Sequence, residues 1–237
     1  MSVGANDLRR IVAVTGLALE ARIASGRGVR TVVGGGEVGE LTAALEREVA
    51  HGAAAFISFG IAGGLAEDLA PGRWIVARAI VSRDARWSVD TDWSDALAER
   101  LPGALVADVA CDDVIVAEPQ QKRAWRRVTG ASAIDTESHV AAAVATRHGL
   151  PFAAFRVIAD PVTRALPPAA IHGLRANGRI SGGAVFGSLL RAPGQLPALV
   201  HTAVDARVAL RALSRGARLL GPGLGYPNLR ELLLDVA

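Results

Sequence analysis

The stretch Ala54–Gly64 reads AAFISFGIAGG, an apolar run of strand-forming residues that leads directly into glycines. Such a run is typical of a strand buried inside a sheet, and the glycines of Gly60–Gly64 predict a tight turn after it. Similar runs occur at Ile11–Thr15, Trp74–Ser82 and Phe152–Ile158. The chain is therefore predicted to contain several short buried strands.

Helical segments alternate with these strands. Apolar residues recur at helical spacing in Val38–His51 and Ser138–His148, and glycines follow both segments, as is common after a helix C-terminus. Alternating strands and helices predict an α/β fold with a mainly parallel sheet. The length of 237 residues fits a single domain, 1–237, in which residues 183–237 form an apolar, Arg-rich helical C-terminal extension.

Composition excludes several classes of protein. Hydrophobic residues make up 51% of the chain and charged residues 21%, which is incompatible with general disorder. With one cysteine and five scattered histidines, we expect neither a disulfide framework nor a metal site, and no cofactor is predicted. The N-terminus does not resemble a signal peptide and no apolar run is long enough to span a membrane, so the expected location is cytoplasmic.

The basic residues do not indicate nucleic-acid binding. The net charge is only +3, and Phe, Trp and Tyr together account for 4% of the residues, which leaves few side chains for stacking on bases. One basic cluster contains Lys122, the only lysine, together with Arg123, Arg126 and Arg127. We expect this cluster to form the solvated face of a helix.

Polar residues follow three of the predicted strands. Glu20, the Gly60–Gly64 segment and Asp160 each lie just beyond a strand C-terminus, the edge where open α/β sheets bind ligands. Two carboxylates beside glycines suggest a polar ligand and acid–base chemistry. Each has a simpler interpretation: Glu20 on a helix surface, Asp160 as a cap of the next turn, and glycines that only serve the turn.

Three motifs in order resemble the purine nucleoside phosphorylase and nucleosidase superfamily. They are GIAGGL at 60–65, DTES at 135–138 and FRVIAD at 155–160. The resemblance covers roughly residues 10–165. It implies a three-layer fold, with a central mixed, mainly parallel sheet flanked by helices.

The resemblance also implies roles for individual residues. Glu137 would bind the ribose hydroxyls, Asp160 would protonate or hydrogen-bond N7 of the leaving purine, and Glu20 would activate a water molecule. A carboxylate can accept hydrogen bonds from both ribose hydroxyls, and a positioned acid typically contributes about 10²- to 10⁴-fold to a rate. The remaining substrate-binding residues would be Ile61, Gly63, Trp87, Val114, Ile115 and Thr136.

Departures from the family pattern bear on the substrate and the nucleophile. Ile61 replaces a threonine that contacts phosphate in phosphorylases, which favours water as the nucleophile, although arginines such as Arg78, Arg86 and Arg156 could still bind phosphate. Thr136 replaces a methionine that packs on the ribose. Ala159 replaces a serine beside the proposed acid, so the orientation of Asp160 must come from elsewhere.

Finer motifs resemble the hopanoid-associated branch of this superfamily. They are LALEA at 17–21, Ala-Asp-Pro at 159–161 and LLRAPGQLP at 189–197. This resemblance implies adenine release from adenosylhopane, a lipid nucleoside, by a homo-oligomer such as a dimer. The alternatives are a methylthioadenosine or adenosylhomocysteine nucleosidase, a phosphorylase of a soluble nucleoside, and a nucleoside-binding module without turnover.

The C-terminal extension carries a long helical pattern from Leu196 to Leu220. Arginines at 207, 211, 215 and 218 fall on one face of this helix. A basic amphipathic helix can lie peripherally on an anionic membrane, and it can equally be a packed helix with a solvated basic face.

Overall fold

A mixed eight-stranded sheet forms the centre of the computed structural model, which describes residues 10–25, 29–35, 37–173 and 177–229. Most neighbouring strands are parallel, and the antiparallel pairs are β3–β7, β4–β5 and β4–β8. The strands are β1 (Arg10–Thr15), β2 (Arg30–Val33), β3 (Ala53–Gly64), β4 (Trp74–Val81), β5 (Arg86–Ser88), β6 (Leu105–Cys111), β7 (Ala133–Asp135) and β8 (Phe152–Asp160).

Five of these strands close into a ring. β3 pairs with β7, β7 with β6, β6 with β4, β4 with β8, and β8 again with β3. β1 and β2 extend the sheet from β3, and β5 extends it from β4. The sheet is therefore partly closed and differs from the open α/β sheet expected from the sequence.

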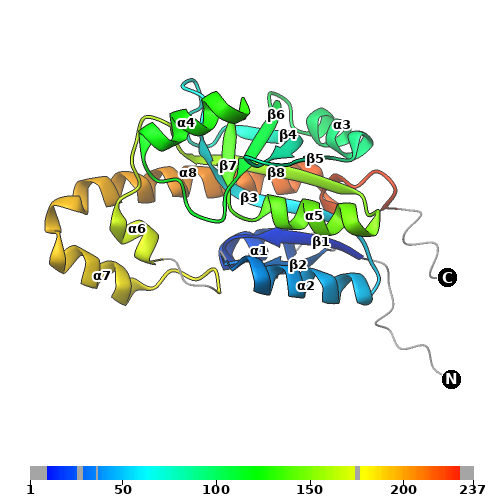
Figure 1. Cartoon of the computed structure of the whole chain (residues 1–237), viewed down its shortest axis with the longest axis horizontal. Helices are drawn as coiled ribbons and strands as arrows, with labels where there is room; N and C mark the ends of the chain where they lie inside the picture. Colours follow the sequence, from blue (N-terminus) through cyan, green and yellow to red (C-terminus); the bar gives the residue numbers. More distant parts are fainter. Residues whose placement is uncertain (1–9, 26–28, 36, 174–176, 230–237) are drawn as a thin grey trace.

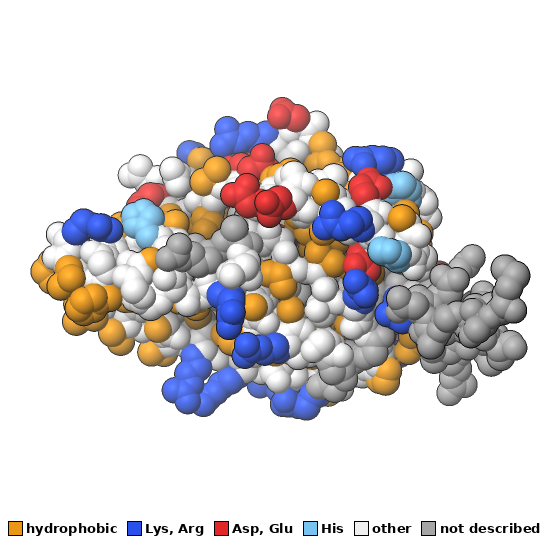
Figure 2. All heavy atoms as spheres, turned by 90° about the horizontal axis from the view of Figure 1, so that it is seen from below, with side chains coloured by type: hydrophobic (Ala, Val, Ile, Leu, Met, Phe, Trp, Pro, Cys, Tyr) orange, Lys and Arg blue, Asp and Glu red, His pale blue; other side chains and the backbone are white. Residues whose placement is uncertain are grey.

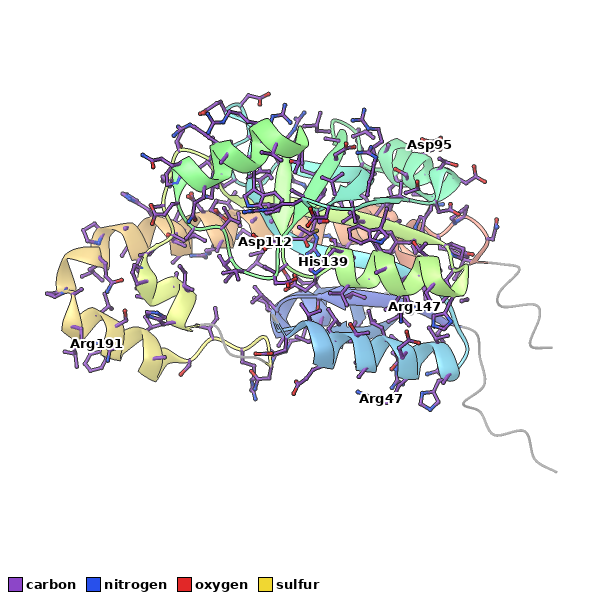
Figure 3. All side chains as sticks on the ribbon, in the orientation of Figure 1. Arg47, Asp95, Asp112, His139, Arg147 and Arg191 are labelled. Carbon is purple, nitrogen blue, oxygen red and sulfur yellow. The ribbon has the colours of Figure 1, made fainter. Side chains whose placement is uncertain are left out.

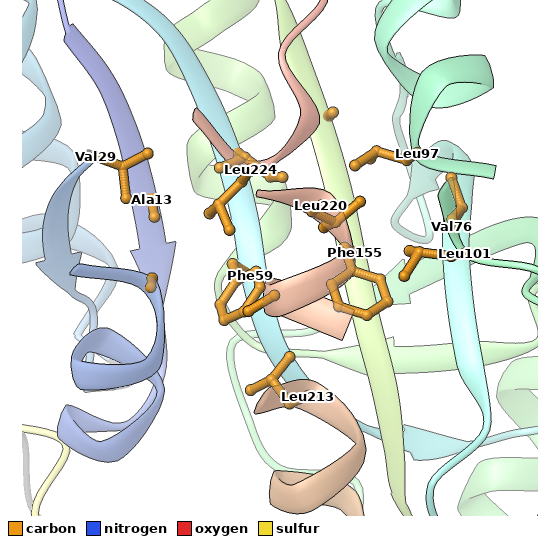
Figure 4. Close-up of a cluster of buried hydrophobic side chains, with 14 of the residues drawn as sticks. Ala13, Val29, Phe59, Val76, Leu97, Leu101, Phe155, Leu213, Leu220 and Leu224 are labelled. Carbon is orange, nitrogen blue, oxygen red and sulfur yellow. The ribbon is translucent and has the colours of Figure 1, made fainter. Parts of the chain in front are cut away.

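Helices cover both faces of the sheet (Figure 1). α1, α3 and α8 share one buried apolar cluster with alternate residues of β3 and β8, part of which is drawn in Figure 4, whereas α2 and α5 share a cluster on the other face. The helices are α1 (Ala18–Ser25), α2 (Val38–Ala50), α3 (Thr91–Arg100), α4 (Pro119–Thr129), α5 (Ser138–His148), α6 (Pro168–Gly173), α7 (Gly182–Arg191) and α8 (Leu196–Leu220), with short 3-10 turns at Pro193–Gln195 and Pro222–Gly225.

The α/β prediction with a central mixed, mainly parallel sheet is confirmed. One local prediction is wrong: Gly60–Gly64 is not a turn but the last part of β3, paired with β8 and β7. The glycines have a steric reason to be there, because side chains from other elements occupy the space above them. A Cβ on Gly60 would lie 2.7 Å from atoms of both Glu20 and Arg156.

α8 has two different halves. Its C-terminal half packs on the sheet through residues such as Leu213 and Leu220, which are buried beside Phe59 and Phe155 (Figure 4). Its N-terminal half and α7 form an arm at one end of the molecule (Figure 1). The predicted extension, residues 183–237, thus includes part of the core, and its residues 230–237 lie outside the described residues.

The arm, defined as residues 182–208, exposes large apolar side chains. Hydrophobic atoms gather at this end of the molecule in Figure 2. The exposed apolar residues of the arm are Phe186, Leu190, Leu196, Val200, Val204 and Val208. No helix in the described part of the chain is long and apolar enough to span a membrane.

Candidate active site

One cavity of about 170 Å³ opens at the C-terminal ends of β1, β3 and β8. Apart from Trp87, all of the predicted site residues line it. Trp87 lies on β5 and packs near the ring of His139, 6.5 Å between ring centroids. The predicted residues that line the cavity are Glu20, Ile61, Gly63, Val114, Ile115, Thr136, Glu137 and Asp160.

Glu20 is buried in the first turn of α1, so its interpretation as a surface residue is wrong. Its Oε2 accepts hydrogen bonds from the backbone N–H groups of Gly16 and Leu17, at 2.9 and 2.8 Å, and its Oε1 accepts one from Ile61 at 2.7 Å. These bonds fix the carboxylate between the start of α1 and β3. Burial raises the pKa of Glu20 to about 7, although nearby Arg156 and the backbone donors oppose the increase.

Arg156 is a buried cation close to the carboxyl groups on this side of the cavity. It is 1% exposed, its Nε lies 2.8 Å from Asp135 Oδ2, and its Nη2 lies 3.8 Å from Glu137 Oε2. Nη2 also donates to Ser58 Oγ at 2.5 Å and to Ser138 Oγ at 3.0 Å. Because the guanidinium is surrounded by groups of the protein itself, it supports the carboxylates and is not free to bind an anion.

Glu137 is buried at the start of α5, above this network. Its Oε1 accepts a hydrogen bond of 2.5 Å from Thr136 Oγ1, and burial raises its pKa while nearby Arg156 lowers it. The backbone of β1 and β2 approaches closely, since a Cβ on Gly16 or Gly34 would lie 2.9 Å from atoms of Glu137. The segment that follows Asp135 is therefore held in place on both sides.

Asp160 ends β8 on the opposite wall of the cavity. Its Oδ2 accepts a hydrogen bond from Lys122 Nζ, and the side chain of Lys122 on α4 is completely buried. The expectation that Lys122 lies on a solvated helix face is wrong, because α4 turns Lys122 and Trp125 inward, whereas Arg123 and Arg127 are exposed. Burial raises the pKa of Asp160, and Lys122 opposes this increase.

Apolar residues complete the cavity between these carboxylates. They come from the segment after β6, from β7 and from the loop before α6, namely Val114, Ile115, Val116, Ile134 and Leu166. His139 Nε2 lies 2.9 Å from Asp113 Oδ1 and so connects α5 to the segment after β6. Figure 3 labels His139 on α5 and Asp112 in the segment after β6. This surface suits a flat, weakly polar ring.

No arginine or lysine lines the cavity in the described part of the chain. Arg78 and Arg86 both bind Asp108, with nitrogen–oxygen distances of 3.0 and 2.7 Å. The arrangement that the sequence left open, in which these two side chains and Arg156 bind phosphate, is thus not present. Among the described residues no group of His, Cys, Asp and Glu side chains is placed to hold a metal ion.

Sequence reasoning missed Lys122 as part of the site. Two signals in the sequence pointed to it: Lys122 is the only lysine of a chain whose other basic residues are arginines, and it lies three positions before a tryptophan. Residues three apart share a helix face, so a buried Trp125 places Lys122 on the buried side.

Solved structures with the same fold include two nucleosidases and a hydrolase. A Helicobacter pylori 5'-methylthioadenosine/S-adenosylhomocysteine nucleosidase mutant with 5'-methylthioadenosine in its active site is 15% identical, with a TM-score of 0.59, over 89% of this chain and 98% of that one. Futalosine hydrolase of Helicobacter pylori gives 14% identity, a TM-score of 0.60 and coverage of 89% and 97%. An S-adenosylhomocysteine nucleosidase from Streptococcus pyogenes gives 16%, 0.56, and coverage of 85% and 98%.

No curated protein matches the sequence. The model of the family described as the phosphorylase superfamily matches residues 10–177, which span β1 to the end of α6 and include each carboxylate of the cavity. The chain therefore belongs to the phosphorylase superfamily.

Proposed function

We propose that this protein hydrolyses the N-glycosidic bond of a purine nucleoside. The observation that carries the proposal is the meeting of three carboxyl groups, Glu20, Glu137 and Asp160, in one cavity with an apolar surface between them. Cleavage of this bond needs an acid at the base, a group that binds the sugar hydroxyls and a base for water. The cavity presents one carboxyl group for each task.

In the proposed reaction the purine lies against the apolar surface and the ribose hydroxyls bind Glu137. Asp160 donates a proton to N7 while the bond between C1′ and N9 breaks and its electron pair moves to the purine. Water attacks C1′ and gives a proton to Glu20. A pKa of Glu20 near 7 suits a general base, because the best catalytic pKa lies near the working pH.

Water is the proposed nucleophile in preference to phosphate. Phosphate sites usually contain cationic side chains, and the described lining of this cavity has none. Arg156 is surrounded by Asp135, Glu137 and two serines, and Ile61 has no hydroxyl to offer. Phosphorolysis would need a cation from elsewhere.

The proposed substrate is adenosylhopane, which would yield adenine and ribosylhopane. The support is the resemblance to the hopanoid-associated branch and the apolar arm beside the cavity. Arg164 in the loop after β8 pairs with Asp205 of α8 at 2.5 Å, so that loop and the arm are in contact. A large apolar group on the ribose could leave the cavity along this side.

Adenine release tests the reaction and its substrate together. Adenosylhopane and methylthioadenosine are assayed separately, each with and without phosphate. Phosphate-independent release from adenosylhopane alone supports the proposal, whereas phosphate-dependent release that yields the 1-phosphate of ribosylhopane would mean that phosphate, not water, is the nucleophile. Release from methylthioadenosine alone, the substrate named for one of the related structures, rejects the hopanoid substrate. Tight nucleoside binding without release would indicate a binding module.

We further propose that the arm touches an anionic membrane from the cytoplasmic side. Leu196, Val200, Val204 and Val208 form a stripe along α8, 42–54% exposed, with arginines at 207 and 211 beside it. Apolar side chains flanked by cations are typical of peripheral membrane helices.

Co-sedimentation with vesicles tests the membrane contact. The native chain should bind vesicles containing phosphatidylglycerol, and Val200→Asp with Val204→Asp should weaken binding about tenfold or more. His201→Asp adds one such charge beside the stripe and should retain most binding. Equal binding of all variants, or none by the native chain, would refute the contact.

We also propose that the chain forms a dimer, as the family resemblance implies. Light scattering after gel filtration tests this proposal.

A further inference from the structure

Lys122 contributes to the cavity without lining it. Its Nζ donates to Asp160 Oδ2 and to the backbone carbonyls of Pro161 and Arg164, both at 3.1 Å. An ammonium group has three protons, and all three are accepted here. The side chain is 0% exposed, so the ammonium group is shielded from solvent and is solvated by these three acceptors instead.

Burial of the Lys122 ammonium group costs free energy of folding. Removing an ammonium group from water costs several kcal/mol, and a hydrophobic side chain of similar size would usually fill the position at lower cost. The two carbonyls connect α4 to the loop after β8. The third acceptor is different, because Asp160 faces the cavity in which the proposed reaction takes place.

Lys122 also supplies a side-chain hydrogen bond to Asp160 that the preceding residue cannot supply. Residue 159 is alanine and offers no side-chain donor, and within the described residues Lys122 makes the only side-chain hydrogen bond to Asp160. The bond goes to Oδ2. Gly63 has no side chain beside this carboxyl group, where a Cβ would lie 3.3 Å from Oδ2 and 3.6 Å from Oδ1.

We infer that Lys122 is a positioning residue that orients Asp160 and stabilises its carboxylate after the proton has passed to the purine. This inference rests on the proposed function, because it assumes that Asp160 is the acid. Before transfer Asp160 is neutral and Lys122 is charged. As the C1′–N9 bond breaks, the proton moves from Asp160 to N7 and leaves an ion pair with Lys122.

Other charged groups near Asp160 are balanced. Asp205 of α8 would oppose ionisation of Asp160, and Arg164 would favour it, but these two bind one another. Among the neighbouring side chains, Lys122 therefore has the largest effect on the pKa of Asp160. It lowers this pKa, whereas burial raises it.

The experiment compares pH profiles of adenine release for the native chain, Lys122→Met and Lys122→Arg. Without the cation Asp160 becomes a weaker acid, so Lys122→Met should lower kcat about 10- to 100-fold and leave KM nearly unchanged. The alkaline limb of its profile should move upward by about one pH unit or more. Lys122→Arg keeps the charge and should keep the limb in place.

Arg123→Met is the matched control. Arg123 is the next residue on α4 and pairs with Glu67 at 2.8 Å between exposed side chains, so its removal should move neither kcat nor the limb. A lowered kcat with an unmoved alkaline limb in Lys122→Met would overturn the inference and leave the proposed function standing. No adenine release by the native chain from any nucleoside tested would refute both.

A second measurement remains decisive if Lys122→Met does not fold. Lysine labelled with ¹⁵N at Nζ gives a single signal from this chain, because Lys122 is the only lysine. In the native protein this ammonium should exchange its protons slowly, and addition of adenine should shift its signal. An unshifted signal in the presence of saturating adenine would contradict a link between Lys122 and the purine site.

Discussion

The two walls of the cavity are held in different ways. On one wall three backbone N–H groups fix Glu20, and Arg156 lies between Asp135 and Glu137. On the other wall Asp160 depends on Lys122. The first wall is built into the sheet by many contacts, whereas the second is adjustable through one side chain. This difference suits a reaction in which Glu20 and Glu137 stay fixed, while Lys122 sets the acid strength of Asp160.

The largest expected effect comes from the second wall. Asp160→Asn keeps the shape of the side chain and an acceptor for Lys122 but removes the acid, so adenine release should fall about 10²- to 10⁴-fold. Single-turnover assays with the substrate that the native chain cleaves measure this. Asp205→Asn, which changes a neighbouring charge outside the cavity lining, should cost much less. Native activity in Asp160→Asn would exclude Asp160 as the acid.

Glu20 should make the stability of the first wall depend on pH. Its pKa is about 7 in the folded protein against an ordinary value of 4.5, so the folded chain binds more protons than the unfolded chain between these values. The free energy of unfolding should therefore fall as the pH rises from 4.5 through 7, by about 3 kcal/mol in all. Urea unfolding at pH 5, 6, 7 and 8 measures this contribution as a difference between the native chain and Glu20→Gln, in which it should vanish. A native profile parallel to that of Glu20→Gln would contradict it.

A smaller effect is expected from a methyl group inserted into the first wall. Gly60→Ala places a Cβ 2.7 Å from both Glu20 and Arg156, which must move, and overpacking of this kind typically costs about 1–3 kcal/mol. Thermal unfolding should show the loss together with reduced adenine release. Gly39→Ala in α2, where no atom lies within 4 Å of the new Cβ, should be neutral or slightly stabilising. Equal melting temperatures for the two variants would mean that Glu20 and Arg156 can move aside without a measurable loss of stability.

The sequence predicted those parts of the fold that local patterns specify. α5 spans Ser138–His148 and is followed by Gly149, and α8 spans Leu196–Leu220, as the helical spacing in each segment predicts. Gly60–Gly64 was misjudged because glycine is a local signal for a turn. Here the segment is a paired strand, and the side chains of Glu20, Arg156 and Asp160 lie where side chains on Gly60 and Gly63 would be. Contacts between residues so far apart in the chain leave no local pattern.

The same distinction applies to the site. Glu20, Glu137 and Asp160 were found because each belongs to a motif, and the structure brings them to one cavity. Lys122 was missed because its burial depends on a carboxylate 38 positions away. Trp87 was named as a substrate-binding residue by the resemblance, but it does not line the cavity, and its ring lies 6.5 Å from that of His139. Motifs identify residues that meet a ligand better than residues that hold those residues in place.

The closed ring of strands has a consequence for how this apolar chain meets other molecules. A sheet associates with foreign strands through its unpaired edges, and closure removes edges. Among the described strands only β2 and β5 end the sheet, with four and three residues, and they carry Arg30 and Arg86. Short, charged edges are poor templates for added strands. Self-association by strand addition is therefore disfavoured. We expect contacts with partners to form through the helical surfaces, above all through the arm.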